Sequence, residues 1–201
     1  MKVLLKQAKI IDQTSAFHNK RMDILIDNGK IIEITDQIKT DKSYKTIESK
    51  DLHVSKGWID LKAHFCDPGH EYKETIESGL DKAAKGGFTQ VGVLPSTHPV
   101  MDQKASIDSL FRKASQKTTG IIAMGCLTKQ MKGKELAELY DMQKSGAALF
   151  TDDRISTDAA VLSNALMYAQ NFSGKIIVSL GNSSLSKNSQ VNEGEASLKT
   201  G

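Results

Sequence analysis

Residues 57–69 read Gly-Trp-Ile-Asp-Leu-Lys-Ala-His-Phe-Cys-Asp-Pro-Gly, an apolar segment that ends in a turn-forming Asp-Pro-Gly. Successive side chains of a β-strand point to opposite faces, so Asp60, Lys62 and His64 share one face of the predicted strand. In sheets of parallel strands, binding and catalytic groups gather at the C-terminal ends of the strands. The segment therefore predicts a strand and, at its end, a candidate site.

Similar apolar runs recur along the rest of the chain at a nearly constant period. Their starting points are 30, 32, 27 and 28 residues apart and lie near Trp58, Phe88, Gly120, Ala147 and Lys175. The residues between them follow the i, i+3, i+4, i+7 spacing of amphipathic helices, as in Ile107, Leu110, Phe111 and Ala114. This alternation predicts βαβ units with a parallel sheet, either doubly wound or closed as a (β/α)8 barrel.

The glycine pattern and the length favour part of a barrel. No Gly-x-Gly-x-x-Gly follows the first strand, which disfavours a dinucleotide-binding doubly wound sheet. A complete barrel takes about 250 residues, whereas about 145 follow residue 56 in this chain of 201. We therefore expect an α/β fold in which residues 57–201 form a partial (β/α)8 TIM-type barrel of about five strands. The open sheet is expected to be closed by a longer polypeptide or by another chain.

Residues 1–56 form a separate region of short strand-like runs. These runs are Val3–Ile11, Met22–Asp27, Lys30–Ile34, Tyr44–Ile47 and Leu52–Val54. Asn28-Gly29 predicts a tight hairpin, because both central residues of a type I′ turn need positive φ. We expect residues 1–56 to form a small antiparallel unit, an N-terminal β-sandwich layer.

The composition is that of an ordinary globular protein. Charged residues make up 25% of the chain and the net charge is +3, with the two signs interspersed, so we expect no nucleic-acid partner. No run approaches the about 20 apolar residues of a membrane span, and we expect no membrane partner. Two cysteines, Cys66 and Cys126, are too few for a disulfide scaffold. These features predict a cytoplasmic protein with reduced thiols.

The segment 57–69 resembles the first barrel strand of the dihydroorotases, members of the amidohydrolase superfamily, whose pattern is Gly-x-x-Asp-x-His-x-His-x-Arg-Asp-Pro-Gly. Similar segments continue in one register at residues 71–79, 84–89, 94–102, 127–129, 146–153 and 192–195. The resemblance covers essentially the whole chain but only the front half of the family. It implies a β-sandwich layer on a metal-dependent barrel that opens and closes a cyclic amide in pyrimidine synthesis. Zinc in such a site polarises a carbonyl and supplies hydroxide near neutral pH.

The chain departs from the family pattern at positions that carry its metal chemistry. Lys62 stands where the resemblance implies a metal-binding histidine, so His64 alone remains of the His-x-His pair. Ser179 occupies the place of another ligand histidine after the fifth strand. Asp153 matches the ligand carboxylate of the fourth strand, although Arg154 follows it where glycine is usual. The resemblance therefore leaves His64 and Asp153 as vestigial metal positions in this half.

Two substrate-binding positions are also altered. Cys66 replaces the arginine expected to hold a substrate carboxylate, and Ser96 replaces an asparagine. A thiol cannot provide the charged, bidentate fork of a guanidinium. We expect Lys62 to fill the metal cavity and pair with Asp153, with extension of Lys62 to solvent as the rival interpretation. Asp152 is expected to brace the turn after the fourth strand.

These substitutions favour a catalytically inactive dihydroorotase-like protein of pyrimidine biosynthesis, without a cofactor, that acts as a structural or partner subunit. We expect a homo-oligomer, and the resemblance implies aspartate carbamoyltransferase as a partner. The first alternative is an active cyclic-amide hydrolase with an altered zinc site. The second is a lysine- or cysteine-dependent enzyme that uses Lys62 as a Schiff base or Cys66 as a nucleophile. For Cys66 the sequence offers one evident base, His64, two residues away.

Overall fold

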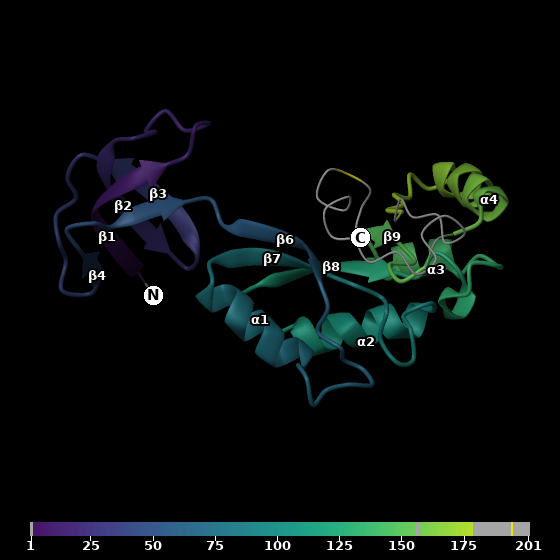
Figure 1. Cartoon of the computed structure of the whole chain (residues 1–201). Helices are drawn as coiled ribbons and strands as arrows, with labels where there is room; N and C mark the ends of the chain where they lie inside the picture. Colours follow the sequence, from purple (N-terminus) through teal and green to yellow (C-terminus); the bar gives the residue numbers. More distant parts are fainter. Residues whose placement is uncertain (1, 156, 179–193, 195–201) are drawn as a thin grey trace. The chain divides into compact units, whose positions relative to one another are not determined.

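A computed structural model describes residues 2–155, 157–178 and 194 of the chain (Figure 1). The chain divides into two compact units, Met1–Gly57 and Trp58–Gly201. Each unit has its own sheet and its own hydrophobic core. Among the described residues, none of the helices combines the length and the apolar character that a membrane crossing requires.

The first unit is a mixed sheet built around one long strand. Its strands are β1 Lys2–Ile11, β2 Arg21–Asp27, β3 Lys30–Thr35, β4 Lys45–Glu48 and β5 His53–Ser55. β2 pairs antiparallel with β1 and with β3, and the φ angles of 47° at Asn28 and 77° at Gly29 confirm the predicted tight hairpin. β4 and β5 pair parallel with β1, so the prediction of an all-antiparallel unit is wrong. Alternating apolar residues identify a strand, but they carry no information about its direction.

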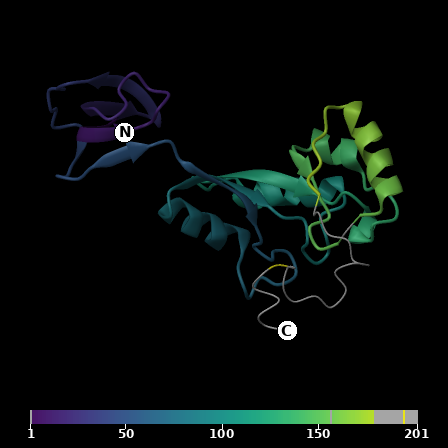
Figure 2. The ribbon, with the colours of Figure 1, turned by 45° about the horizontal axis from the view of Figure 1, so that its top comes forward.

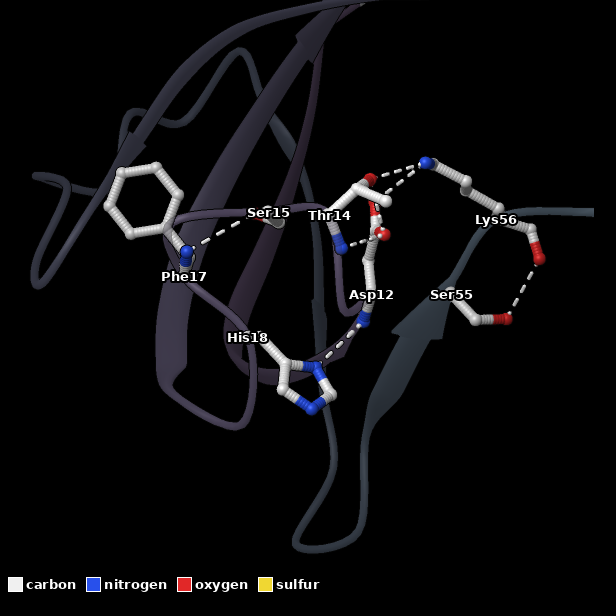
Figure 3. A network of polar contacts seen from close by, with 7 residues as sticks. All are labelled: Asp12, Thr14, Ser15, Phe17, His18, Ser55 and Lys56. Carbon is white, nitrogen blue, oxygen red and sulfur yellow. Dashed lines mark hydrogen bonds and ion pairs between the residues drawn. The ribbon is translucent and has the colours of Figure 1, made fainter.

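A polar network holds the turn after β1 (Figure 3). The Asp12 carboxylate accepts hydrogen bonds from the backbone N–H and the hydroxyl of Thr14, and it lies 3.3 Å from Lys56 Nζ. The backbone N–H of Asp12 donates to His18 Nδ1 at 3.2 Å. The hydrogen bonds from Thr14, followed by the charge of Lys56, lower the pKa of Asp12. Because Lys56 directly follows β5, these contacts join the turn after β1 to the end of the unit and give the network a structural role.

The second unit alternates strands and helices. Its elements are β6 Trp58–Ala63, α1 Ile76–Lys85, β7 Phe88–Val93, α2 Lys104–Ala114, β8 Gly120–Gly125, the short 3-10 helix η1 Lys129–Met131, α3 Leu139–Lys144, β9 Leu149–Phe150 and α4 Ala159–Gln170. The strands form a parallel sheet in the order β6-β7-β8-β9. Figures 1 and 2 show α1 and α2 on the same face of this curled sheet. The predicted βαβ units and partial barrel are confirmed.

The core of the second unit lies between the sheet and the helices. It is made of fully or nearly fully buried apolar side chains, among them Leu80, Val91, Val93, Ile107, Leu110, Ala123 and Phe150. Burial of each of the larger side chains, the valines, leucines, isoleucine and phenylalanine, stabilises the fold by about 1.5–3 kcal/mol relative to exposure. The core thus fixes the four strands against α1 and α2, and with them the loops that follow the strands.

The two edges of the sheet lie at β6 and at the predicted fifth strand. In the described part of the chain, β6 pairs with β7 alone, and Ile59 and Leu61 on β6 are 55% and 59% exposed. The predicted fifth strand, from Lys175, is reduced among the described residues to a parallel bridge between Phe150 and Ile176. Ser179 lies outside the described residues. β6 therefore presents unpaired backbone groups and apolar side chains that further strands can cover.

Candidate active site

The loops that follow β6, β7 and β9 bring together four of the residues predicted from the sequence. His64 and Cys66 follow β6, Ser96 follows β7, and Asp153 follows β9. Because these strands are parallel, their C-terminal ends meet at one edge of the sheet. The parallel arrangement therefore brings His64 and Asp153 to the same edge, and each of them contacts Ser96.

His64 uses both ring nitrogens in contacts within this group. Its Nε2 atom lies 3.0 Å from the backbone oxygen of Ser96 and 3.2 Å from Nη2 of Arg154. Its Nδ1 atom lies 3.6 Å from Sγ of Cys66. The imidazole thus lies between the loops after β6, β7 and β9, and each of its ring nitrogens has a polar neighbour.

Only one of the two carboxylate oxygens of Asp153 has a hydrogen-bond partner among the described residues. Its Oδ2 atom accepts a hydrogen bond of 2.8 Å from the hydroxyl of Ser96. Its Oδ1 atom is buried and has no hydrogen-bond partner among the described residues. A buried carboxylate oxygen without a partner costs free energy, so this atom marks a place where a donor or a cation would bind favourably.

A small cavity adjoins Asp153. Its volume is about 80 Å³, and its lining residues are Leu61, Lys62, Leu94, Met124, Thr151, Asp153, Ile177 and Val178. Lys62 and Asp153 line the same cavity, as the sequence predicts, but no ion pair within 4.0 Å joins them in the described part of the chain. The predicted direct pairing is therefore wrong for this structure. Lys62 is exposed, because in an open half barrel solvent hydrates its ammonium group better than a cavity wall does.

Asp152 holds the loop after β9 to the loop after β8, which confirms its predicted bracing role. It is 3% exposed and accepts hydrogen bonds from the backbone N–H groups of Leu127 and Thr128, at 3.0 and 3.2 Å, and from the Thr128 hydroxyl. Burial raises the pKa of Asp152, although the hydrogen bonds from Thr128 and Leu127 partly offset this effect. These hydrogen bonds thus join the loop after β8 to the loop after β9 at the residue that precedes Asp153.

Sequence reasoning missed another buried carboxylate, Asp67, in the loop that carries His64 and Cys66. Asp67 is 2% exposed, forms an ion pair with Lys113 of α2, and accepts a hydrogen bond of 3.1 Å from the backbone N–H of Ile76 at the start of α1. One signal was present, because Lys113 follows Leu110 by three residues on the buried stripe of α2. A lysine on such a stripe indicates a buried anionic partner, although it does not say which one.

We expect Asp67→Ala to lower the free energy of unfolding by about 2–4 kcal/mol, because it leaves the Ile76 N–H and the Lys113 ammonium without their buried acceptor. Asp67→Asn should lose less, since its amide oxygen still accepts from Ile76. Urea unfolding followed by circular dichroism measures both variants. Equal stabilities of the parent and Asp67→Ala would mean that this carboxylate does not hold the loop.

The described residues do not by themselves make up the zinc site that the resemblance implies. Such a site needs at least three nitrogen, sulfur or oxygen ligands that converge on one point. Over the described residues, no group of three or more His, Cys, Asp or Glu side chains could hold a metal ion. His64 instead faces Ser96 and Cys66, and the cavity beside Asp153 is lined by a lysine.

Known proteins match this chain in sequence. A family model described as dihydro-orotase-like matches residues 53–201. A dihydroorotase from Geobacter metallireducens is 34% identical over 203 residues, which cover 100% of this chain and 48% of that protein. A dihydroorotase from Syntrophotalea carbinolica is 36% identical over 203 residues, with 100% and 47% covered. The chain thus spans about half the length of these curated relatives.

Solved structures match the fold. The L-hydantoinase (dihydropyrimidinase) from Arthrobacter aurescens superposes with a TM-score of 0.70 at 20% identity, covering 88% of this chain and 40% of that one. A dihydroorotase crystal structure gives a TM-score of 0.60 at 16% identity, covering 90% and 51%. At these identities the likeness shows the fold alone. The family model covers most of the chain, so the chain belongs to the dihydroorotase-like family.

Proposed function

We propose that this chain is the front part of a dihydroorotase-like protein of pyrimidine biosynthesis that has lost zinc-dependent hydrolysis and serves as a structural or partner subunit. The observation that carries the proposal is Lys62, which lines the cavity beside Asp153 where the family resemblance implies a histidine ligand. An ammonium about 4 Å from a divalent ion is repelled by roughly 8 kcal/mol at an effective dielectric of 20. It also removes one donor, which leaves too few ligands for a tight site.

The substrate-binding positions support the same proposal. The Ser96 hydroxyl donates to Asp153, and Cys66 lies against His64. Neither side chain carries the positive charge that would hold a substrate carboxylate. In this half the chain therefore lacks two of the metal-binding histidines and the carboxylate-binding arginine that the family resemblance implies.

A role in assembly is proposed from the family resemblance. Ile59 and Leu61 on β6 are more than half exposed, and β6 pairs on one side alone among the described strands, but the strands that complete a barrel would cover this edge. We propose a homo-oligomer, with aspartate carbamoyltransferase as the other subunit that the resemblance implies. Light scattering of the purified protein, alone and mixed with the carbamoyltransferase of the same organism, tests both kinds of assembly. The mass of a single chain in the first sample and no complex in the second would oppose an assembly role.

A second candidate function is an active cyclic-amide hydrolase with an altered metal site. The observation that favours it is the buried Oδ1 atom of Asp153, which has no partner among the described residues and is free to accept a cation. The proposed loss of activity and this alternative differ in what the purified protein does to dihydroorotate.

We expect no hydrolysis of dihydroorotate and no closure of its ring-opened product above the buffer rate, with or without added zinc. The change in ultraviolet absorbance on ring opening measures both directions. Asp153→Ala is the matched control, since it removes the remaining ligand carboxylate. Turnover that requires zinc and disappears in Asp153→Ala would establish the hydrolase and contradict the proposal.

A further inference from the structure

The cavity beside Asp153 carries two opposite charges that do not neutralise each other. Lys62 and Asp153 both line it, yet in the described part of the chain neither belongs to an ion pair within 4.0 Å. We propose that this cavity binds small zwitterionic amino acids, with the ammonium group of the ligand at Asp153 and its carboxylate at Lys62. The inference rests on the proposed loss of zinc chemistry, because a metal ion at Asp153 would take the place of the ammonium group.

The Asp153 carboxylate is restrained but lacks a counter-charge. Its Oδ2 atom accepts a hydrogen bond of 2.8 Å from the hydroxyl of Ser96, and Ser96 is itself 2% exposed, so this contact holds the carboxylate in place. Its Oδ1 atom has no hydrogen-bond partner among the described residues. Hydrogen bonds from a cationic donor to a carboxylate are stronger than those between neutral groups. An ammonium group beside Asp153 therefore supplies both a donor and the missing positive charge.

Lys62 suits the other end of the ligand. It is exposed although it lines the cavity, which places it at the opening. The buried walls are formed by Leu94, Met124 and Thr151, which are 7%, 1% and 3% exposed. A carboxylate bound at the opening keeps part of its water, so its desolvation costs little. The positive charge that repels a divalent ion attracts this carboxylate, and a ligand that is neutral overall meets no net repulsion.

The volume and the walls of the cavity limit the size of the ligand. A cavity of about 150 Å³ holds benzene, so the volume of about 80 Å³ found here accommodates about three heavy atoms. These are the ammonium nitrogen, the α-carbon and one methyl carbon, with the carboxylate at the opening. Apolar side chains make up most of the wall and would leave a polar ligand side chain without partners; they are Leu61, Leu94, Met124, Ile177 and Val178. Glycine and alanine therefore fit better than amino acids with long or charged side chains.

Three compounds of similar size separate the two charges of the ligand. Alanine carries both, propionate carries the carboxylate alone, and ethylammonium carries the ammonium group alone. Methionine residues labelled with ¹³C in the methyl group report binding by nuclear magnetic resonance, because Met124 lines this cavity and Met101 lines a separate one. Substitution Met124→Leu assigns the reporter signal. A chelator in every sample keeps metal ions out of the comparison.

We expect alanine to shift the Met124 signal in a saturable way and to leave the Met101 signal unchanged. Propionate and ethylammonium should bind at least about tenfold more weakly than alanine, because each lacks one of the two charge-assisted contacts. Lys62→Gln should weaken the binding of alanine and propionate but not that of ethylammonium. Asp153→Asn should weaken the binding of alanine and ethylammonium but not that of propionate.

This crossed pattern separates recognition of charge from a structural effect, which would weaken all three compounds alike. Lys129→Gln is the matched control, since it removes an exposed lysine that does not line the cavity. Circular dichroism and the melting temperature establish that each variant is folded. A Met124 signal that alanine leaves unchanged in the folded parent, or alanine binding that survives both Lys62→Gln and Asp153→Asn, would overturn the proposal. Zinc-dependent turnover of dihydroorotate would instead contradict the proposed function, so the two failures are distinguishable.

Discussion

Replacing Lys62 with histidine is expected to raise the affinity of the purified protein for zinc by at least about 100-fold. The variant removes an ammonium whose repulsion of a divalent ion is roughly 8 kcal/mol at 4 Å and an effective dielectric of 20. It also restores a His-x-His pair with His64, at a position that lines the cavity beside Asp153. The expected gain is well below that repulsion, because the exposed lysine can swing away from an incoming ion. A 100-fold change corresponds to about 2.7 kcal/mol.

Lys62→Gln is the matched control for this variant, since it removes the charge without adding a ligand. Competition with a chromophoric zinc chelator measures the affinity of the parent and of both variants. If Lys62→Gln gains as much as Lys62→His, charge alone limits binding and the missing imidazole does not. If neither variant gains, the loops no longer have the shape of a metal site, and Lys62 is not the residue that prevents metal binding.

Replacing Asp152 with alanine is expected to lower the free energy of unfolding by about 3–5 kcal/mol. The change leaves the backbone N–H groups of Leu127 and Thr128 without their acceptor in a fully buried position, and each such group costs about 1–3 kcal/mol. Asp152→Asn should lose much less, because its amide oxygen accepts from both N–H groups and its amide nitrogen can donate to the Thr128 hydroxyl. Urea unfolding measures the difference, and equal losses for the two variants would contradict it.

The pH dependence of Asp152 gives an independent check. Burial raises the pKa of this carboxyl in the folded state above its ordinary value of 3.8, so the unfolded chain releases the proton at lower pH than the folded protein does. The contribution of Asp152 to stability is therefore complete below about pH 4 and declines as pH rises toward the raised folded pKa. The stability of the parent relative to Asp152→Asn should fall over that window. A difference that rises with pH would mean that the folded pKa is lowered instead.

The sequence contained enough information to predict the alternation of strands and helices in the second unit. The 27–32 residue period and the stripe through Ile107 and Leu110 have one physical cause, the burial of one helix face against a parallel sheet. The direction of β4 and β5 was not predictable in the same way. Parallel pairing with β1 depends on the connections that lead into these strands, and a pattern of alternating residues is the same for both directions.

The sequence predicted which residues make up the candidate site, but it did not predict which of them contact one another. Parallel strands bring His64, Ser96 and Asp153 to one edge, which the sequence implies, and Asp152 braces their loops as expected. The predicted pairing of Lys62 with Asp153 is wrong. Solvation of the ammonium group decides where a lysine head group lies, and the strand pattern carries no information about it.

The contact of His64 with Cys66 illustrates the same limit of sequence reasoning. Their spacing by two residues gave no sign that the loops after β7 and β9 would orient the imidazole toward the thiol. That orientation is a property of three loops together, and each loop lies far from the others in sequence.

The most direct test of the proposed loss of metal chemistry is the zinc affinity of the unaltered protein after removal of all metal. Titration against a chromophoric chelator is expected to give a dissociation constant weaker than about 1 μM, and Asp153→Ala should leave it unchanged, because His64 and Asp153 are too few ligands for a tight site. One zinc bound per chain with nanomolar affinity, and released by Asp153→Ala, would contradict the account.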